Sequence, residues 1–587
     1  MLYIQGMLSV ARDIQDVCDE FLTRQGVTEP VSFEVSLTKD VTKGDLYTNL
    51  PFASTKILNK NPVAIAIDLQ NFLEQKLDKN IFSKIEVAGG YVNFWIHIDA
   101  VQGDLEVVEH LTFSGKKIIF DYTDPNPMKE FHIGHLMSNT IGEAFARIIE
   151  ITGATVKRCS YQGDVGRHIA VTIWGLQFLS EAWPDDDKIS LTDKVKHLGS
   201  AYVAGNQKLK SIEEKEGIES SAYKNAITEV ESINKQVYDR SDAEINMVYD
   251  QGREWSLEKF EELYKILGTK FDQYFFESQS GPVGARIVEQ NPDVFVEGEG
   301  GARIFKGEEY GLHTRVFINK QGLPTYEGKE VGLVKMKWDT WNYDRSYVIT
   351  ANEQDEVFKV TKTAISQIMK DAGERSYHIG HGMMKLVGEK MSSRTGKIVA
   401  GDELVEQMTE ASLLKMKGRP IEESKKRDIA EAIAVAAIKF TILKQNFRKD
   451  IIFDREKALA LEGDSGPYIQ YAIVRIISLL KKVETEQNKK EEIHPLSSEG
   501  FLLKRTLVRF EHVCFSAIDE MAPQHIAQYM IDVASKFNAF YAQTKILNQG
   551  SDGVFVVNPN AIELCVLTKK ILEKGLYLLG IRVVEEM

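Results

Sequence analysis

This 587-residue sequence contains little cysteine, little proline and no long apolar run. Its four cysteines are scattered without CxxC spacing, so we expect no disulfide and no structural metal, and we predict a reducing, cytoplasmic environment. Fourteen prolines and 27% charged residues exclude collagen-like and disordered chains. No run reaches the roughly 18 apolar residues of a membrane span, and the first residues lack the basic segment of a secretory signal. We therefore expect neither membrane insertion nor secretion.

The net charge of −14 argues at first sight against a nucleic-acid partner. Phosphate binding is supplied by lysine and arginine, which release counterions from the nucleic acid. A large acidic protein can nevertheless carry a local basic face. One such cluster comprises Lys415, Lys417, Arg419, Lys425, Lys426 and Arg427. A solvated helix surface is the alternative interpretation, so charge leaves the question open.

The length predicts several domains, because single hydrophobic cores stop growing at roughly 250–300 residues. We predict an N-terminal α/β module over 1–112, where helical periodicity is followed by an alternating strand pattern. A strand–helix–strand pattern, typical of parallel sheets, opens a middle domain over 113–401 with a helical insertion at about 185–265. Residues 402–587 have helical periodicity almost throughout, which predicts a C-terminal helical bundle.

A group of polar residues follows the predicted strand that contains Asp121, in the stretch DYTDPNPMKEFHIGH. His132 and His135 share one face of the first turn of the next helix, where free backbone N–H groups favour anions. Gly134 has no side chain, so adenine or ribose can approach the backbone. The alternative is a helix with two ordinary histidines. The same four letters recur at 378–381, but without the DPNP turn, and there we predict part of a strand.

A second motif, GEKMSSRTGK at 388–397, is a polar loop with glycine near each end. Its hydroxyls and cations suit a triphosphate and its pyrophosphate leaving group. Alone, the stretch is equally typical of a solvated loop. A strand-to-helix HIGH element followed by KMSS-R resembles the two signature motifs of class I aminoacyl-tRNA synthetases. The order and separation of this pair make the resemblance specific.

Within that class the chain resembles arginyl-tRNA synthetases along almost its whole length. The matching segments are GDLYTN at 44–49, GGYVNFWI at 89–96, YQGDVG at 161–166, GREWSL at 252–257, FFES at 275–278, TY at 325–326, EQ at 353–354, FDREKALALEGDSGPYIQYAIVR at 453–475 and FNAFY at 537–541. The resemblance implies an α/β protein with a class I Rossmann-like catalytic domain. It also implies an added N-terminal module for the tRNA elbow and an all-α anticodon-binding bundle at the C-terminus.

The implied activity is that of an arginine–tRNA ligase, with L-arginine, ATP and tRNA(Arg) as partners. Arginyl-adenylate would form with Mg²⁺ on the phosphates, arginine would pass to the tRNA 3′ end, and AMP and pyrophosphate would leave. We expect a monomer. The catalytic residues implied are His132, His135, Lys129, Lys390 and Arg394. The ATP-binding residues implied are His132, Gly134, His135, Met391, Ser392 and Ser393.

Arginine offers a planar, permanently charged guanidinium, so its pocket needs carboxylates and fixed acceptors. The candidates that match the family pattern are Asp121, Asp124, Asn126, Tyr326, Glu330 and Gln354. Asp124 stands where many relatives have serine, and Glu330 where they more often have aspartate. Either could instead be a surface acid.

For stacking on unpaired tRNA bases the candidates are Tyr471, Phe537 and Tyr541, although core packing is the commoner fate of aromatic side chains on apolar helices. Three rival functions stay open. The chain could be another class I synthetase such as the cysteinyl enzyme, against which the missing zinc ligands count. It could be a catalytically silent paralogue that serves as an RNA-binding or scaffold protein. It could also perform an adenylyl transfer outside translation.

Lys129 generates a testable prediction, because Ser393 stands where most class I enzymes have the second lysine of KMSKS. The family uses a lysine upstream of HIGH when that loop lysine is absent. We expect Lys129→Ala to lower the rate of arginine activation far more than it weakens arginine binding, as for a contact made in the transition state. Pyrophosphate exchange at saturating arginine measures this, and an unchanged rate would show that Lys129 is a solvated side chain.

Overall fold

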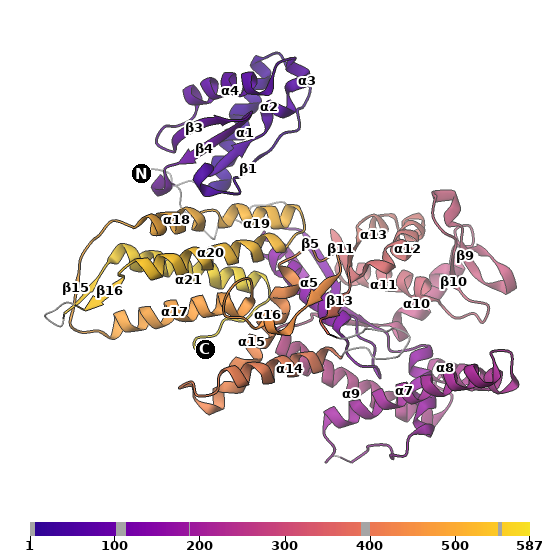
Figure 1. Cartoon of the computed structure of the whole chain (residues 1–587). Coiled ribbons are helices and arrows are strands. Elements are labelled where there is room, and N and C mark those ends of the chain that lie inside the picture. The colour runs from indigo at the N-terminus through magenta and orange to yellow at the C-terminus, as the bar shows by residue number, and fades with distance from the viewer. Residues whose placement is uncertain (1–5, 101–112, 187, 389–399, 550–553) are drawn as a thin grey trace. The chain divides into compact units, whose positions relative to one another are not determined.

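The structure, a computed structural model, describes residues 6–100, 113–186, 188–388, 400–549 and 554–587. The contacts between residues divide the chain into two compact units. Figure 1 labels many of their helices and strands. The first unit comprises Met1–Thr112, Ala460–Leu578 and Val583–Met587, and the second comprises Phe113–Leu459 and Leu579–Arg582. We predicted domain boundaries at 112 and 402, so the division at Leu459 lies later in the chain than the predicted one.

The second unit is built around a parallel sheet. Its strands and helices are β5 (Lys117–Tyr122), α5 (Ile133–Glu150), β6 (Thr155–Gln162), α6 (Arg167–Gly175), α7 (Leu191–Glu216), α8 (Ser221–Asp239), α9 (Ala243–Leu267), β7 (Gln273–Phe276), α10 (Glu277–Gln290), β8 (Val296–Glu297), β9 (Arg303–Phe305), β10 (Arg315–Ile318), α11 (Tyr326–Trp341), β11 (Arg345–Ala351), α12 (Asp355–Ile368), α13 (Lys370–Glu374), β12 (Ser376–His381), β13 (Met384–Leu386), α14 (Gly401–Lys415), α15 (Glu423–Leu443), β14 (Ile451–Phe453) and α16 (Arg455–Ala458).

Five strands of this unit pair in the order β12-β11-β5-β6-β7, and every neighbouring pair is parallel. The chain enters at β5 in the middle of the sheet, adds β6 and β7 on one side, and then adds β11 and β12 on the other. This strand–helix–strand arrangement confirms the predicted Rossmann-like fold. Because the direction of winding reverses between β5 and β11, their carboxyl ends form the crevice in which such sheets bind ligands.

Three long helices, α7, α8 and α9, lie in the range predicted as a helical insertion and stand between α6 and β7 in the chain. Their core contains buried Leu198 and Val237, and Trp183 stacks on Trp255 with ring centroids 4.9 Å apart. The insertion thus has an apolar core of its own. It also contacts the sheet domain through Met128, which belongs to the same apolar cluster.

Helix α15 belongs to the second unit because it packs against α5 and α9. Lys439 on this helix is completely buried, and its Nζ donates hydrogen bonds to the carbonyl oxygens of Leu267 (2.7 Å) and Gly580 (2.9 Å). Burial lowers the pKa of the Lys439 ammonium to about 7. The lysine therefore joins the end of α9 to the short returning segment Leu579–Arg582.

The N-terminal part of the first unit is an α/β module, as predicted. Its elements are α1 (Met7–Arg24), β1 (Val35–Leu37), β2 (Leu46–Thr48), α2 (Leu50–Ala53), α3 (Thr55–Leu58), α4 (Pro62–Lys76), β3 (Phe82–Ala88) and β4 (Tyr91–Ile96). The strands form an antiparallel sheet in the order β1-β2-β4-β3.

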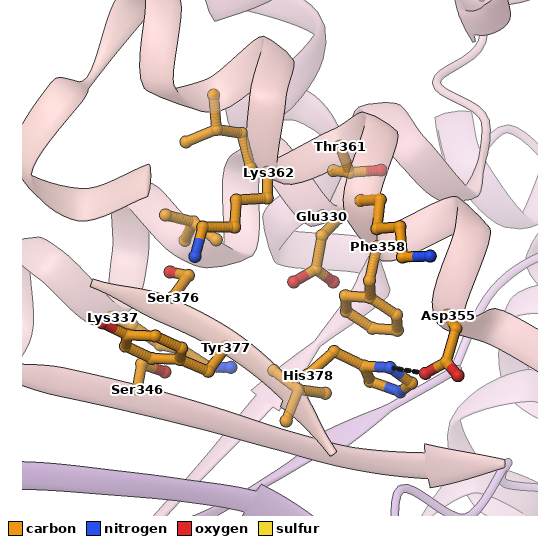
Figure 2. A pocket seen from close by; sticks show the side chains of 14 residues that line it. Glu330, Lys337, Ser346, Asp355, Phe358, Thr361, Lys362, Ser376, Tyr377 and His378 are labelled. Atoms are coloured by element: carbon orange, nitrogen blue, oxygen red, sulfur yellow. Dashed lines mark hydrogen bonds and ion pairs between the residues drawn. The ribbon is translucent and has the colours of Figure 1, made fainter. Parts of the chain in front are cut away.

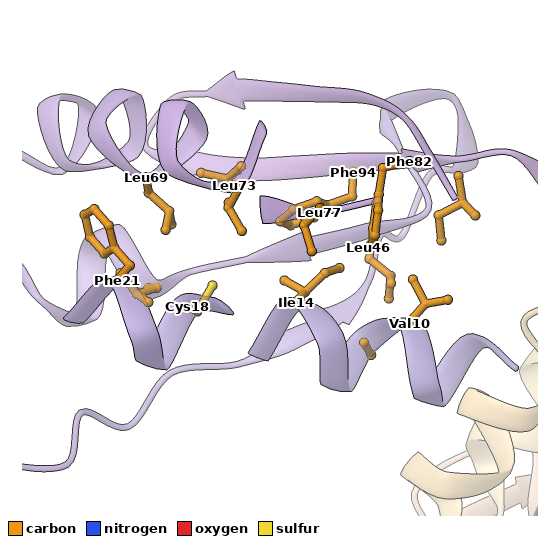
Figure 3. Packing of buried hydrophobic residues seen from close by; sticks show 14 of the residues in the cluster. Val10, Ile14, Cys18, Phe21, Leu46, Leu69, Leu73, Leu77, Phe82 and Phe94 are labelled. Atoms are coloured by element: carbon orange, nitrogen blue, oxygen red, sulfur yellow. The ribbon is translucent and has the colours of Figure 1, made fainter. Parts of the chain in front are cut away.

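Helices α1 and α4 cover this sheet because each carries an apolar stripe. On α1, Ile14, Cys18 and Phe21 recur every three or four residues and are buried. Figure 3 shows these side chains facing Leu69 and Leu73 of α4. Complete burial of a side chain of this size contributes roughly 1.5–3 kcal/mol, so the stripe accounts for the stable docking of α1.

The C-terminal part of the first unit is a helical bundle, as predicted. Its helices are α17 (Gly466–Thr485), α18 (Ser498–Leu507), α19 (Phe510–Asp519), α20 (Gln524–Gln543) and α21 (Pro559–Leu578). Helix α20 contacts each of the other four. Three short strands that the sequence did not predict, β15 (Lys489–Glu491), β16 (Leu547–Gln549) and β17 (Phe555–Val557), form a small sheet.

An ion pair connects the two parts of the first unit. Asp45 is completely buried, and its carboxylate accepts hydrogen bonds from the backbone N–H of Ile96 (2.8 Å) and from Arg505. Buried Arg509 donates to the carbonyl oxygens of Thr38 and Asp45. The acid of the GDLYTN segment therefore has a structural role in the module, which motif matching alone did not reveal.

Removal of one partner of this pair should destabilise the first unit. We expect Arg505→Met to lower its unfolding free energy by about 3–5 kcal/mol, because Asp45 stays buried without its cation. The double variant Asp45→Asn with Arg505→Met should be less destabilised than the sum of the two single variants. Urea unfolding followed by circular dichroism measures this coupling, and additive losses would contradict a direct ion pair.

Candidate active site

A cavity of about 770 Å³ lies at the carboxyl ends of β5 and β11. Ten of the residues predicted for ATP, arginine or catalysis line it, and these are Asp121, Asp124, Asn126, Lys129, His132, Gly134, His135, Tyr326, Glu330 and Gln354. They come from the end of β5, the loop between β5 and α5, the start of α5, the start of α11 and the turn Asn352–Gln354 after β11. The other five, Lys390, Met391, Ser392, Ser393 and Arg394, lie outside the described residues.

The two histidines of the HIGH element build the first turn of α5. His132 is the N-cap residue, and its Nδ1 accepts a hydrogen bond from the N–H of Gly134 (3.2 Å). His135 Nδ1 accepts one from the N–H of His132 (3.2 Å), so the pair forms a reciprocal capping box. Their rings stack with centroids 3.6 Å apart. The backbone thus fixes both rings at the helix start.

Both imidazoles are neutral at physiological pH. Burial, helped by the charge of Lys129, lowers the pKa of His132 to about 4. Burial also lowers the pKa of His135 well below its usual value. Because each Nδ1 accepts a backbone hydrogen bond, the proton sits on Nε2, which can donate to a phosphate or ribose oxygen. The pair therefore offers neutral donors, while the formal positive charge comes from Lys129.

The loop between β5 and α5 is strained. Thr123, Asp124 and Met128 have positive φ values of 80°, 45° and 61°, which side chains other than glycine rarely adopt. Hydrogen bonds hold this conformation: the N–H of Thr123 donates to Ser138 Oγ (3.0 Å) and that of Met128 to Ser256 Oγ (2.8 Å). The DPNP turn is thus fixed from α5 on one side and from α9 on the other.

The end of the cavity lined by Tyr326 and Glu330 is rich in carboxyl groups. Burial raises the pKa of Glu330 to about 7, and burial with the nearby charge of Asp121 raises that of Asp124 well above its usual range. Asp121 is completely buried and forms an ion pair with Lys337, whose ammonium is equally buried. Three acids therefore face one internal cation, and a cationic group of a substrate would restore the balance.

The sequence analysis also missed several cavity residues, among them Glu277, Arg315 and His381. Glu277 directly follows β7 and pairs with Lys329 (2.7 Å). His381 ends β12, so the second HIGH stretch is a strand as predicted, yet its last residue reaches the same cavity. Glu277 and His381 share one signal, a polar residue at the carboxyl end of a parallel strand, which becomes informative once the strand order is known. Arg315 begins the antiparallel strand β10 and does not share this signal.

Asp164 of the YQGDVG segment positions the cavity wall without lining it. Its completely buried carboxylate accepts hydrogen bonds from Ser278 N–H (2.8 Å) and Oγ (2.7 Å), and from Arg253 Nε (3.0 Å). It thereby ties the loop after β6 to the start of α10 and to α9. The neighbouring Gly163 lies against Asn126, since a β-carbon there would be 2.2 Å from Asn126 Oδ1.

The predicted base-stacking residues lie in the first unit. Arg475 lies over the rings of Tyr471 and Tyr541, 4.9 and 5.2 Å from their centroids, and both rings are partly exposed. Phe537 is completely buried, so a base cannot reach its ring. The prediction for Phe537 was wrong, because its position on α20 faces the bundle core.

The basic cluster near α14 and α15 is largely paired with acids. Arg427 forms ion pairs with Glu406 (2.8 Å) and Glu410 (3.0 Å). Lys425 and Lys426 pair with Glu422 and Glu423. These exposed pairs agree with the alternative of a solvated helix surface.

Comparison with known families assigns the fold. A model of the catalytic domain of class I (R) tRNA synthetases matches residues 101–455, more than half of the chain. The chain belongs to this family. A model of the arginyl-tRNA synthetase N-terminal domain matches 9–96 of this synthetase, and one of the DALR anticodon-binding domain matches 469–587. The N-terminal module, class I core and helical bundle predicted from the sequence are thus confirmed as the family's domains.

Relatives cover nearly the whole synthetase. The arginine–tRNA ligases of Clostridium kluyveri (strain NBRC 12016) and Clostridium botulinum (strain Okra / Type B1) are each 28% identical, with 91% of this chain and 93% of theirs aligned. The solved arginyl-tRNA synthetase of Thermus thermophilus is 23% identical with a TM-score of 0.77, over 98% of this chain and all of that one. That of Plasmodium falciparum is 20% identical with a TM-score of 0.75, over 98% and 99%. These structures share the fold.

The contact between Gly163 and Asn126 gives a prediction about the cavity wall. In Gly163→Ala the new methyl group displaces Asn126, so we expect the arginine KM in pyrophosphate exchange to rise about tenfold, as for one lost hydrogen bond. In an Asn126→Ala background the same change should have little further effect. A full additional loss in that background would show that Gly163 acts through another group.

Proposed function

We propose that this synthetase is an arginine–tRNA ligase. It activates L-arginine with ATP to arginyl-adenylate and transfers the arginine to the 3′ end of tRNA(Arg), releasing pyrophosphate and then AMP. The observation that carries this proposal is the polarity of the cavity. Neutral imidazole donors and Lys129 stand at the start of α5, whereas Asp121, Asp124 and Glu330 gather at the other end.

The end of the cavity that carries Asp121, Asp124 and Glu330 suits a guanidinium. An arginine side chain brings five N–H donors and a permanent charge, and it would hold the buried Glu330 in its ionised form. Tyr326 and Gln354 supply further hydrogen-bonding groups at the cavity wall. A neutral isostere such as citrulline would leave the buried acids without a cation, which is the costlier state. We assign the α-amino or carboxylate group to Asn126, which lies beside Gly163.

Chemistry at the other end requires positioning and charge stabilisation. A carboxylate oxygen of arginine attacks the α-phosphorus of ATP, and pyrophosphate leaves. The terminal ribose hydroxyl of the tRNA then attacks the acyl carbon, and AMP leaves, so no covalent enzyme intermediate is needed. The Nε2–H groups of His132 and His135 would donate to the phosphate or ribose, and Lys129 would stabilise charge that develops on the phosphates. Lys390 and Arg394 are proposed for the same task from the KMSS loop.

Magnesium enters this proposal with the nucleotide. Among the described residues, no group of three or more histidine, cysteine, aspartate or glutamate side chains is arranged to hold a metal ion. We therefore assign Mg²⁺ to the ATP phosphates, where it would neutralise charge on the leaving pyrophosphate. The protein's own part is to hold the Mg²⁺-bound nucleotide against the start of α5.

The first unit is proposed to bind the tRNA. In the N-terminal module, Phe52 and Tyr91 are each 43% exposed, and their ring centroids lie 4.8 Å apart. Exposed aromatic faces of this kind stack on unpaired bases, so we assign residues 1–112 to the tRNA elbow. In the C-terminal bundle, Tyr471 and Tyr541 beside Arg475 form the candidate surface for the anticodon arm.

We further propose a monomer that works in the cytoplasm. All four cysteines are buried free thiols, as expected for a protein kept in a reducing environment. No helix in the described part of the chain is long and apolar enough to cross a membrane.

The proposed activity is tested by amino-acid-dependent ATP–pyrophosphate exchange across all twenty amino acids, with and without total tRNA. We expect exchange with arginine alone, and Glu330→Gln should weaken the response to arginine without creating a response to another amino acid. Exchange with a different amino acid would assign the chain to a sister synthetase. No exchange with or without tRNA would identify a catalytically silent paralogue.

A further inference from the structure

Lys337 is a buried cation next to the proposed amino-acid pocket, and no sequence motif pointed to it. Its side chain is 1% exposed and pairs with Asp121, which is completely buried. Asp121 lines the main cavity, whereas Lys337 lines a second cavity of about 180 Å³ between α11, α12, β11 and β12. Figure 2 shows Lys337 beside Ser346 in this side chamber, with the Glu330 carboxylate also facing into it. The ion pair thus lies between the two cavities.

We infer that Lys337 is a positioning residue for arginine recognition: its ammonium holds the Asp121 carboxylate in place so that the carboxylate oxygen it does not engage can accept a hydrogen bond from the substrate. This inference rests on the proposed function. Only one oxygen of Asp121 is engaged by Lys337. The other, Oδ1, is buried and has no hydrogen-bond partner among the described residues.

The backbone explains why these groups meet. Lys337 follows Glu330 by seven residues on α11, which is two helical turns, so both side chains project from the same face of the helix. Asp121 lies in β5, directly opposite Val348 of β11 in the central strand pair. Helix α11 therefore presents an acid and a cation to the strand edge where the crevice opens.

Lys337 supplies the cation that a completely buried carboxylate such as Asp121 requires. Without it, the carboxylate would lose both its charge partner and the contact that fixes its direction toward the cavity. Ionisable groups near the pair include Asp124 after β5, Cys159 on β6, Tyr326 and Glu330 on α11, Tyr343 after α11, and Asp355, Lys359, Lys362, Tyr377 and His378 at the side chamber. Of the two other lysines at the chamber, Lys362 lies 4.4 Å over the ring of Tyr377 and Lys359 pairs with Glu356 (2.5 Å).

The test is isothermal calorimetry of arginine binding to the full chain, together with pyrophosphate exchange at saturating arginine. In Lys337→Met we expect the dissociation constant to rise about 10–100-fold, as for loss of a charge-assisted hydrogen bond. The kcat of activation at saturating arginine should change much less.

Lys335→Met on the exposed side of the same helix is the matched control and should behave as the wild type. Lys337→Arg retains the charge and should restore most of the arginine affinity. If Lys337→Met does not fold, Asp121→Asn provides the test, since it keeps the volume and should raise the dissociation constant similarly. Unchanged arginine affinity in the folded variant would overturn the inference and leave the proposed function intact. Absence of arginine binding by the wild-type chain would overturn both.

Discussion

The parallel pairing of β5 with β11 joins two segments that lie far apart in the sequence, and the position of the cavity follows from it. β5 leads into the strained DPNP turn and the HIGH element, while β11 leads into the turn that carries Gln354. Neither segment could form the cavity alone, because one carries the imidazoles and the other closes the amino-acid end. The hydrogen bond from Ser138 Oγ of α5 to the carbonyl oxygen of Ile349 (2.6 Å) further secures this pairing.

Burial acts in opposite ways on the two ends of the cavity. At the start of α5 it keeps His132 and His135 uncharged, so that they serve as directed hydrogen-bond donors. At the acidic end of the cavity, burial makes a negative charge on a carboxyl group costly. Asp124 and Glu330 consequently retain protons more readily than exposed acids do. The cationic side chain of an amino acid is therefore electrostatically complementary to the acidic end of the cavity. An anionic nucleotide is complementary to the start of α5.

The sequence was informative where a local motif carries the chemistry. The HIGH element and the pocket acids could be chosen in advance, because their spacing along one helix or beside one strand defines their geometry. Glu277 and His381 could not, because their place in the cavity depends on the order of strands in the sheet. Lys337 could not be predicted as a site residue for a related reason. A lysine on an amphipathic helix is usually solvated, and only the packing of α11 against β5 buries this one.

Local sequence patterns also could not predict where one domain ends and the next begins. Helices α14 and α15 have the same periodicity as the helices of the bundle, and only their packing partners assign them to the second unit. Tyr471 and Phe537 illustrate the limit within one bundle, since both belong to motifs shared with the family. Their helical faces decide that the first is accessible and the second is core.

The contact between Lys439 and Gly580 bears on how this chain folds during synthesis. The second unit is not continuous, because Leu579–Arg582 joins it only after the whole stretch Ala460–Leu578 of the first unit. A ribosome that has translated residue 459 has therefore not yet made every residue of the second unit. Until the returning segment arrives, Lys439 lacks the Gly580 carbonyl and keeps only that of Leu267. Completion of the catalytic core is thereby delayed until most of the tRNA-binding bundle has emerged.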